Sequence, residues 1–241
     1  MKYYKINPGG NTTAILKGDF TKQEKIKLAK KIMSKDKAIE QVGFWVCPKD
    51  INNNGRLDMA GGEFCGNAIR ALGMLICRET GKTNLKIESS GTKEIIEIFI
   101  KGDTSSIKLS LNNFRASENV CSLQGIKYVF LSRSVEKEEA YEILKRKFSK
   151  YSASCVISYK KEKNLYVIKP IIWVRDINSL IEETACGSGT LALAYLIYLK
   201  RKLKIFKIKQ PSGTIFSVII RDKKAYLSGP ILKIENKTLS F

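Results

Sequence analysis

The stretch ETACGSGTLALAYLIYL, residues 183–199, decides how this chain can fold. A cysteine precedes a Gly-Ser-Gly turn, and an almost unbroken apolar helical pattern follows. A helix that is apolar nearly all round has to be enclosed by other elements. A single cysteine in such a place is usually a packing residue, because a buried thiol behaves as a small hydrophobic group.

The same arrangement occurs a second time, in GGEFCGNAIRALGMLI, residues 61–76. Cys65 and Cys186 lie about half of the 241-residue chain apart, and Gly91 and Gly213 further downstream keep nearly the same separation. A repeat of this length indicates two structural units built on one plan. The second cysteine therefore changes the interpretation of the first, because packing alone does not require both.

Other patterns repeat in the same order around the two cysteines. Amphipathic patterns predict a surface helix upstream of each cysteine, preceded by a short strand, and further strands follow downstream. The predicted strands and surface helices occupy residues 12–16, 21–35, 85–100 and 105–111 in the first half, and 127–132, 134–150, 206–220 and 223–229 in the second.

The sequence thus predicts an α/β fold in two halves, with the sheet of each half wrapped around its own buried helix. We place the halves at residues 1–117 and 118–241, joined through the polar stretch at 112–125. Duplicated halves tend to pack about a pseudo-twofold axis. Such packing would bring both helix N-termini, and hence both thiols, to one cleft between the halves.

Composition excludes several classes of chemistry. The chain contains no histidine, which removes Ser-His and Cys-His nucleophile pairs and histidine-containing zinc sites. Its six cysteines form no Cys-x-x-Cys pair, so we expect reduced thiols and no metal site. Those outside the repeat are interpreted as packing or surface thiols, namely Cys47, Cys77, Cys121 and Cys155.

A net charge of +20 raises the question of a nucleic-acid partner. The lysines are spread over the whole chain without an arginine-rich run, so we interpret them as a solvated surface and expect no nucleic acid. The longest apolar run, residues 191–199, is far shorter than the roughly 20 residues of a membrane span. With no signal-peptide pattern at its start, the chain is expected to be soluble and cytoplasmic, without a membrane partner.

Two cysteines at two helix N-termini suggest acid and base chemistry. A helix N-terminus stabilises an anion and lowers the pKa of a thiol there. One thiolate could remove a proton from a carbon beside a carboxylate while the opposite thiol supplies a proton to the other face. The sequence has no glycine-rich loop typical of phosphate binding that could hold pyridoxal phosphate, so we expect no cofactor.

These residues resemble the cofactor-independent two-cysteine racemases and epimerases typified by diaminopimelate epimerase. The resemblance spans the chain, through PGGNTT near the start, CGNA at Cys65 and ACGSGT at Cys186. It implies the diaminopimelate-epimerase-like fold, catalysis by Cys65 and Cys186, and a homodimer. It also implies that a set of small and polar residues contacts the substrate's carboxylate and amine, namely Asn11, Gly66, Asn67, Gly187 and Ser188.

The departures from that pattern concern the substrate. The arginine that would meet a second carboxylate is missing before the second cysteine, where this chain reads INSLIEETAC. Acidic side chains near the two motifs would favour a basic substrate instead, and they are Asp58, Glu63, Glu182 and Glu183. The motifs are similar to those of histidine racemases. We therefore predict a racemase of histidine or another basic amino acid, with Asp58, Glu63 and Glu183 among the substrate contacts.

Several alternatives stay open at this point. Diaminopimelate epimerase is the second choice of function, and a lysine-rich nucleic-acid binder is a non-enzymatic one. Isomerases related to phenazine biosynthesis share the duplicated architecture but use an acid in place of paired thiols. Glu182 and Glu183 fit a role at the helix N-terminus as well as they fit substrate binding. Arg70 is expected to pair with one of these acids in a structural role.

Overall fold

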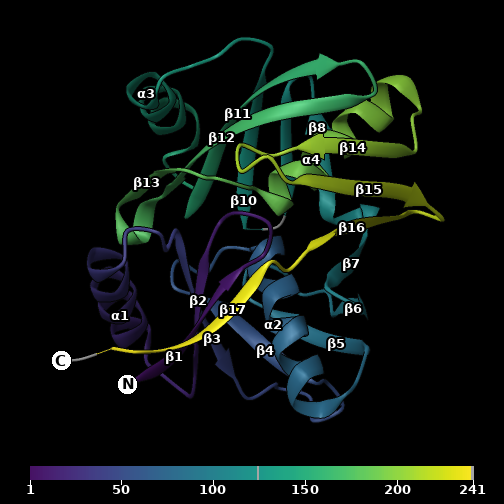
Figure 1. The fold of residues 1–241 in the computed structure, drawn as a ribbon. Helices are drawn as coiled ribbons and strands as arrows, with labels where there is room; N and C mark the ends of the chain where they lie inside the picture. The colour runs from purple at the N-terminus through teal and green to yellow at the C-terminus, as the bar shows by residue number, and fades with distance from the viewer. Residues whose placement is uncertain (124, 240–241) are drawn as a thin grey trace.

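The structure, a computed structural model, describes residues 1–123 and 125–239. Its elements form two α/β groups, one stacked on the other (Figure 1). The elements of the first half are β1 (Lys2–Asn7), β2 (Thr13–Lys17), α1 (Lys22–Lys35), β3 (Gln41–Val46), β4 (Gly55–Met59), α2 (Gly66–Thr80), β5 (Asn84–Ser89), β6 (Ile96–Lys101), β7 (Thr104–Ser110), a 3-10 helix (Leu111–Asn113) and β8 (Phe114–Ser117).

The second half repeats this succession. Its elements are β9 (Val120–Leu123), β10 (Ile126–Leu131), α3 (Lys137–Phe148), β11 (Ala153–Glu162), β12 (Leu165–Val174), a 3-10 helix (Arg175–Ile177), β13 (Ser179–Glu182), α4 (Gly187–Arg201), β14 (Ile205–Lys209), β15 (Ile215–Arg221), β16 (Lys224–Pro230) and β17 (Lys233–Thr238). The expected mixed α/β fold is confirmed, and both surface helices form where the amphipathic patterns predict them.

The strands of the two halves pair in the same order and direction. In the first half, β2 is parallel to β3, β3 antiparallel to β4, and β4 parallel to β5, while β5, β6 and β7 are antiparallel neighbours. In the second half, β10, β11, β12, β14, β15 and β16 repeat each of these relations in turn. The sequence repeat therefore corresponds to a repeated strand topology.

Each half ends in a strand that pairs with the first strand of the other half. Strand β8 pairs with β9, and β17 returns to pair with β1, while β7 and β16 join the two groups edge to edge. The polar join expected at 112–125 contains a strand pair. It forms the β8–β9 hairpin because Phe114, Cys121 and Leu123 alternate with polar residues and face the core, and Gln124 lies outside the described residues. The division at 117/118 stays a prediction.

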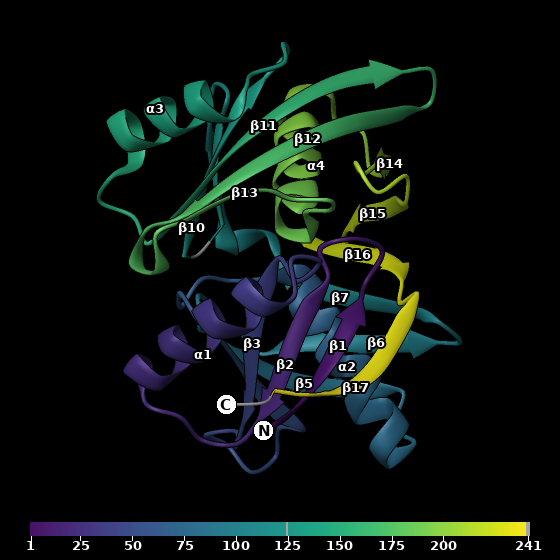
Figure 2. The same cartoon turned by 60° about the vertical axis from the view of Figure 1, so that its left-hand side comes forward.

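The two central helices are the most deeply enclosed elements. Helix α2 contacts every strand from β2 to β7, and α4 contacts strands β8, β9, β10, β15 and β16. The surface helices lie on the outer faces of the two groups, α1 against β3 and α3 against β11 and β12 (Figure 2). Each half thus holds its sheet between one buried helix and one surface helix, so several strands are apolar on both faces.

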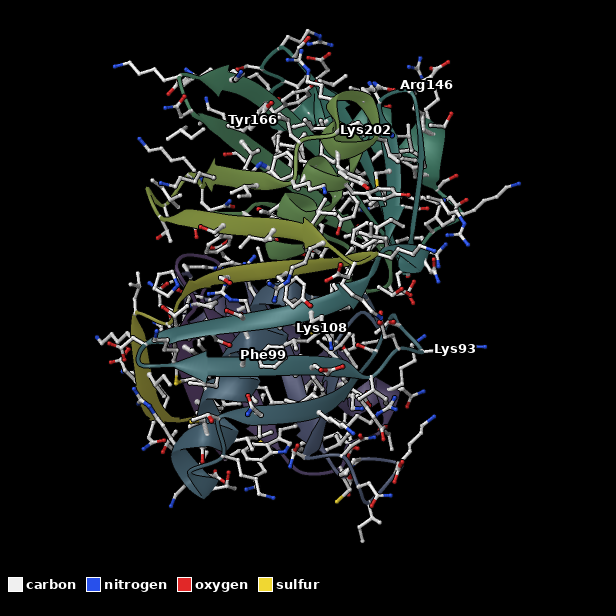
Figure 3. All side chains as sticks on the ribbon, turned by 90° about the vertical axis from the view of Figure 1, so that its right-hand side faces the viewer. Lys93, Phe99, Lys108, Arg146, Tyr166 and Lys202 are labelled. Atoms are coloured by element: carbon white, nitrogen blue, oxygen red, sulfur yellow. The ribbon has the colours of Figure 1, made fainter. Side chains whose placement is uncertain are left out.

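Lysine side chains are distributed over the surface of the molecule. Lys93, Lys108 and Lys202 extend from three different parts of the chain on the face shown in Figure 3, where Phe99 also lies. Lys108 pairs with Glu97 across the β6–β7 hairpin. Nowhere in the described part of the chain is a helix long and apolar enough to cross a bilayer.

Candidate active site

Each of the two repeated cysteines caps a buried helix. Cys65 is the N-cap of α2, and its Sγ accepts a hydrogen bond from the backbone N–H of Ala68 at 3.4 Å. Cys186 caps α4 in the same way, accepting from the N–H of Gly189 at 3.3 Å. Both thiols sit at the positive end of a helix dipole, which favours a thiolate, but burial and neighbouring groups outweigh this effect and raise the pKa of both.

The two helix N-termini meet. An ideal Cβ on Gly66 would lie 3.3 Å from the backbone nitrogen of Ser188, and one on Gly187 would lie 2.6 Å from Oδ1 of Asn67. The Asn67 side chain also donates to the carbonyl of Ala185 at 3.1 Å. A glycine at both first helical positions is thus what allows the close approach of α2 and α4.

A buried carboxylate connects the two halves at this point. Oε1 of Glu183 accepts hydrogen bonds from Nδ2 of Asn11 and from Nε2 of Gln41, both at 2.6 Å. Oε1 of Gln41 accepts from the Cys65 thiol, also at 2.6 Å. The second oxygen of Glu183 is buried without a hydrogen-bond partner. Of these residues sequence reasoning missed Gln41, for which the one signal is a polar residue opening the apolar strand QVGFWV.

The buried groups of this cluster favour their neutral forms. Burial raises the pKa of Cys65 well above its ordinary value. The neighbouring Cys155 thiol, followed by burial, raises the pKa of Cys186 in the same direction. Burial and then the nearby Cys186 raise the pKa of Glu183. A cation entering the cluster would reverse this balance, because an opposite charge stabilises thiolate and carboxylate.

Glu63 is a second buried carboxylate close to the thiols, two residues before Cys65. Its side chain is 4% exposed, and its Oε2 has no hydrogen-bond partner. Burial raises its pKa to about 7. Glu63 and Glu183 are therefore the acidic residues that the fold brings beside Cys65 and Cys186.

The structure does not bring Asp58 to this cluster. Asp58 lies on the face of β4 toward α1, where it pairs with Lys25 at 2.7 Å and with Arg56 at 2.9 Å. Its neighbour Leu57 points the other way, into the core around α2. The reason is the twofold alternation of side chains along a strand. Glu182 is also outside the cluster, because it is exposed on β13.

Arg70 has a structural role, but the expectation that it pairs with an acid is wrong. Its guanidinium donates to the carbonyls of Ser105 at 2.9 Å, Pro230 at 3.0 Å and Pro8 at 3.3 Å, and to Oδ1 of Asn67 at 3.2 Å. Burial lowers its pKa to about 9. Arg70 thus fastens the loop before Asn11 and the end of β16 to α2.

The remaining cysteines are free thiols in different surroundings. Cys47 is exposed, Cys77 is half-buried, and Cys121 and Cys155 are buried. Cys155 differs from the others because it lies beside Cys186 and raises the pKa of that thiol. Its position on β11 gave no sign of this contact. In the part of the chain that the structure describes, no group of three or more cysteine and acidic side chains is arranged to hold a metal ion.

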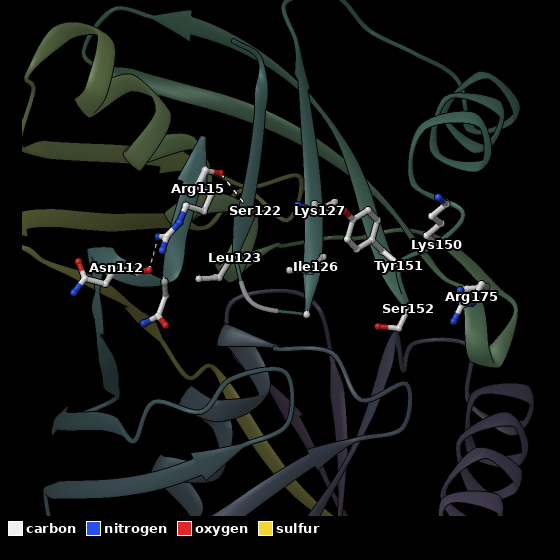
Figure 4. A pocket seen from close by; sticks show the side chains of 12 residues that line it. Asn112, Arg115, Ser122, Leu123, Ile126, Lys127, Lys150, Tyr151, Ser152 and Arg175 are labelled. Atoms are coloured by element: carbon white, nitrogen blue, oxygen red, sulfur yellow. Dashed lines mark hydrogen bonds between the residues drawn. The ribbon is translucent and has the colours of Figure 1, made fainter. Parts of the chain in front are cut away.

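A basic hollow of about 600 Å³ is lined by residues of both halves, and neither thiol is among them (Figure 4). Arg115, Lys127, Lys150 and Arg175 line it. The two guanidinium groups already donate to backbone carbonyls, Arg115 to Asn112 and Arg175 to the carbonyl of residue 149. Much of its positive charge therefore serves to fix the surrounding loops.

Comparison with known proteins identifies the family. The model of the histidine racemase CntK N-terminal domain matches the chain twice, over residues 1–130 and over residues 119–233. A histidine racemase of Fusobacterium nucleatum is 30% identical, and the alignment covers 96% of this chain and 93% of that protein. This chain belongs to the histidine racemase CntK family. It is an isomerase of the amino-acid racemase and epimerase class.

A further histidine racemase and two solved structures are also similar to this chain. A histidine racemase of Staphylococcus aureus is 24% identical, with 95% of this chain and 91% of that protein covered. Among solved structures, a hydroxyproline epimerase from Agrobacterium vitis, with bound trans-4-hydroxy-L-proline, has a TM-score of 0.62 at 12% identity and covers 98% and 92% of the two chains. A phenazine biosynthesis protein of the PhzF family from Enterococcus faecalis has a TM-score of 0.61 at 12% identity, with 99% and 100% covered. At these identities the two structures show the fold alone.

Proposed function

We propose that this chain racemises histidine without a bound cofactor, with Cys65 and Cys186 as the two bases. The observation that carries the proposal is the meeting of two thiol-capped helix N-termini beside the buried carboxylate of Glu183. The relatives named above, which are histidine racemases, support the choice of substrate. The chemistry requires no histidine in the protein, since thiols replace it as acid and base.

The finer description of the fold belongs to this proposal. We assign the diaminopimelate-epimerase-like fold, with a pseudo-twofold axis between halves 1–117 and 118–241. The repeated strand topology supports it, as does a single domain model that matches the chain in both halves. We expect the chain to bind its amino-acid substrate and to bind neither nucleic acid nor a membrane. We also expect the enzyme to be a cytoplasmic homodimer.

The substrate's α-carboxylate is placed at the two helix N-termini. Helix geometry leaves the N–H groups of Gly66, Asn67, Gly187 and Ser188 without an intrahelical acceptor. These amides come from two helices that meet, so they converge on one anion. As the α-proton leaves, negative charge flows into the carboxylate, and each amide donor then contributes more than in the ground state. Loss of one such donor typically costs roughly 3 to 4 kcal/mol.

The substrate's ammonium group is placed against Glu183 and Asn11. Glu183 has one oxygen without a partner, and an ammonium there would hold the carboxyl group ionised. The same positive charge would lower the pKa of both thiols, which burial raises in its absence. Substrate binding thus supplies the charge that makes a thiolate accessible inside a closed site.

Inversion then needs one thiolate and one thiol on opposite faces of the α-carbon. One thiolate takes the α-proton and becomes a thiol, and the other thiol gives its proton to the opposite face and becomes a thiolate. Atoms and charge balance, and at the end the two cysteines have exchanged their protonation states. The reverse direction uses the same two groups in exchanged roles, so both enantiomers are substrates.

The test follows chirality and α-deuterium when the purified protein is incubated with L-histidine in D2O. We expect D-histidine to form with deuterium at the α-carbon. Cys65→Ser and Cys186→Ser should each lower kcat by roughly 10² to 10⁴-fold, the usual contribution of a positioned acid or base. Cys47→Ser, at an exposed thiol, is the control and should keep full activity.

Two results would contradict the proposal. A protein that epimerises LL-diaminopimelate but leaves L-histidine unchanged would overturn the substrate assignment and favour the diaminopimelate epimerase alternative. A protein in which both active-site thiols are replaced by serine, yet which racemises at the wild-type rate, would refute the two-thiol mechanism.

A further inference from the structure

We propose that the imidazole ring of the substrate binds in a small cavity beside Glu63 and donates a ring N–H to the Glu63 carboxylate. This inference rests on the proposed racemisation of histidine and adds to it the group that recognises the side chain. Neither helix N-terminus nor thiol distinguishes one amino acid from another, so specificity has to come from elsewhere in the site.

The cavity has a volume of about 20 Å³ and lies between the two halves. One wall comes from α1, β3 and the end of β4, and the other comes from β12 and β13. Most of the lining is apolar, contributed by Ala29, Met33, Val42, Ala60, Ile172, Val174 and Ile181. Apolar walls suit the faces of a flat ring, whose polar atoms lie at its edge.

Glu63 supplies the polar end of this cavity. It is among the lining residues, and its buried Oε2 has no hydrogen-bond partner. Burying an acceptor without a partner costs about 1 to 3 kcal/mol, and more when the group is charged. A ligand N–H would remove that cost. Gly61 leaves the room that the carboxylate needs, because an ideal Cβ there would lie 2.6 Å from Oε2.

The other acid of the cavity is already occupied. Glu40 also lines the space, but Oε2 accepts from the backbone N–H of Thr184 at 2.8 Å and Oε1 accepts from its hydroxyl at 2.5 Å. This pair holds the loop before Cys186 in place. Of the two carboxylates, Glu63 therefore has the oxygen that can meet a ring.

Gln41 connects the cavity to the reacting centre. It lines the cavity, and its side chain also hydrogen-bonds the Cys65 thiol and Glu183. An amino acid with its α-carbon between the thiols can therefore extend its side chain past Gln41 toward Glu63. The cavity as it stands holds about one water molecule. Entry of a ring requires the walls from the two halves to separate.

The experiment compares Glu63→Gln and Glu63→Met with Glu182→Gln, which removes the same charge from an exposed position. For each folded variant, racemisation of L-histidine and of L-leucine is measured. Glu63→Met should lower kcat/KM for histidine by about 10 to 100-fold, the equivalent of one hydrogen bond to a charged group. Glu63→Gln, which keeps an acceptor oxygen, should lose less. Both should reduce the preference for histidine over leucine, and Glu182→Gln should not.

A merely structural Glu63, holding an internal water, predicts a different pattern. In that case Glu63→Met would lower kcat/KM equally for histidine and leucine, or would leave both values unchanged. Either result would overturn the inference. Binding of free imidazole, measured by calorimetry, separates this failure from that of the proposed function. If wild-type protein does not racemise histidine, the proposed function fails, and the subsite still stands if wild type binds imidazole and Glu63→Met does not. Equal imidazole binding by both proteins rejects the subsite.

Discussion

At the scale of the residue, the ionisation of Glu63 couples the site to stability. Its pKa is raised from an ordinary 4.5 to about 7 in the folded protein by burial. Between these values the folded state keeps a proton that the unfolded state releases. The free energy of unfolding therefore falls as pH rises through this window, by roughly 3 kcal/mol in total.

Glu63→Gln lacks this titration. The free energy of unfolding of the variant, relative to that of the wild type, should therefore increase as pH rises from below 4.5 to above 7. Urea denaturation across this range measures the difference between the two proteins. Glu40 and Glu183 contribute slopes of the same sign to both proteins and cancel in the comparison. A difference that stays constant with pH would show that folding leaves the pKa of Glu63 unchanged.

Residues also show where prediction from sequence stops. Cys65 and Cys186 could be found because a repeat marks them twice, and the glycines after them share the motif. Gln41 and Cys155 lie on strands in other parts of the sequence, and only the pairing of those strands brings them to the thiols. Asp58 was misplaced because the face of a strand that meets the buried helix depends on register, which shifts with a single residue.

At the scale of the element, the two cysteines serve both as helix caps and as chemical groups. Serine is a better N-cap than cysteine and places an oxygen where the sulfur accepts the hydrogen bond, whereas alanine removes the acceptor at a cost of about 0.5 to 2 kcal/mol. We expect Cys65→Ser and Cys186→Ser to keep the wild-type stability and Cys65→Ala and Cys186→Ala to lose about that amount.

Thermal and urea unfolding of the four variants checks this expectation. The racemisation rate of the same samples shows whether the loss of activity is independent of the loss of stability. All four should lose at least roughly 10²-fold in kcat, although only two are destabilised. Serine variants as unstable as the alanine variants would mean that the sulfur contributes by packing, not as an acceptor for Ala68 and Gly189.

Local sequence patterns predicted the presence of helices and strands more reliably than they predicted where each element ends. Thr21 and Glu24 form a capping box that starts α1 one residue after the amphipathic stretch begins, and Gly81 ends α2 in the left-handed conformation. Residues 112–125 were expected, from their polar composition, to join the two halves. Their pairing as β8 and β9 depends on a partner strand, which composition does not reveal.

At the scale of the whole molecule, the exchange of end strands ties the two halves into one cooperative unit. Strand β17 completes the sheet that begins with β1, β8 pairs with the first strand of the second half, and β7 pairs with β16 between them. The buried residues around α2 and α4 also form a single apolar cluster across the two halves. If the sheet of one half unfolds, the other half loses a strand partner.

The two tryptophans test this coupling because each half contains one. Trp45 lies on β3 of the first half and Trp173 on β12 of the second. In Trp45→Phe only the second half reports by fluorescence, and in Trp173→Phe only the first half does. We expect each variant's fluorescence transition in urea to coincide with its own circular dichroism transition, as two-state unfolding requires. If, in either variant, the urea midpoint measured by fluorescence differed from the midpoint measured by circular dichroism, the two halves would unfold independently. The exchanged strands would then be contacts between two stable domains, and the site between them could open without loss of either fold.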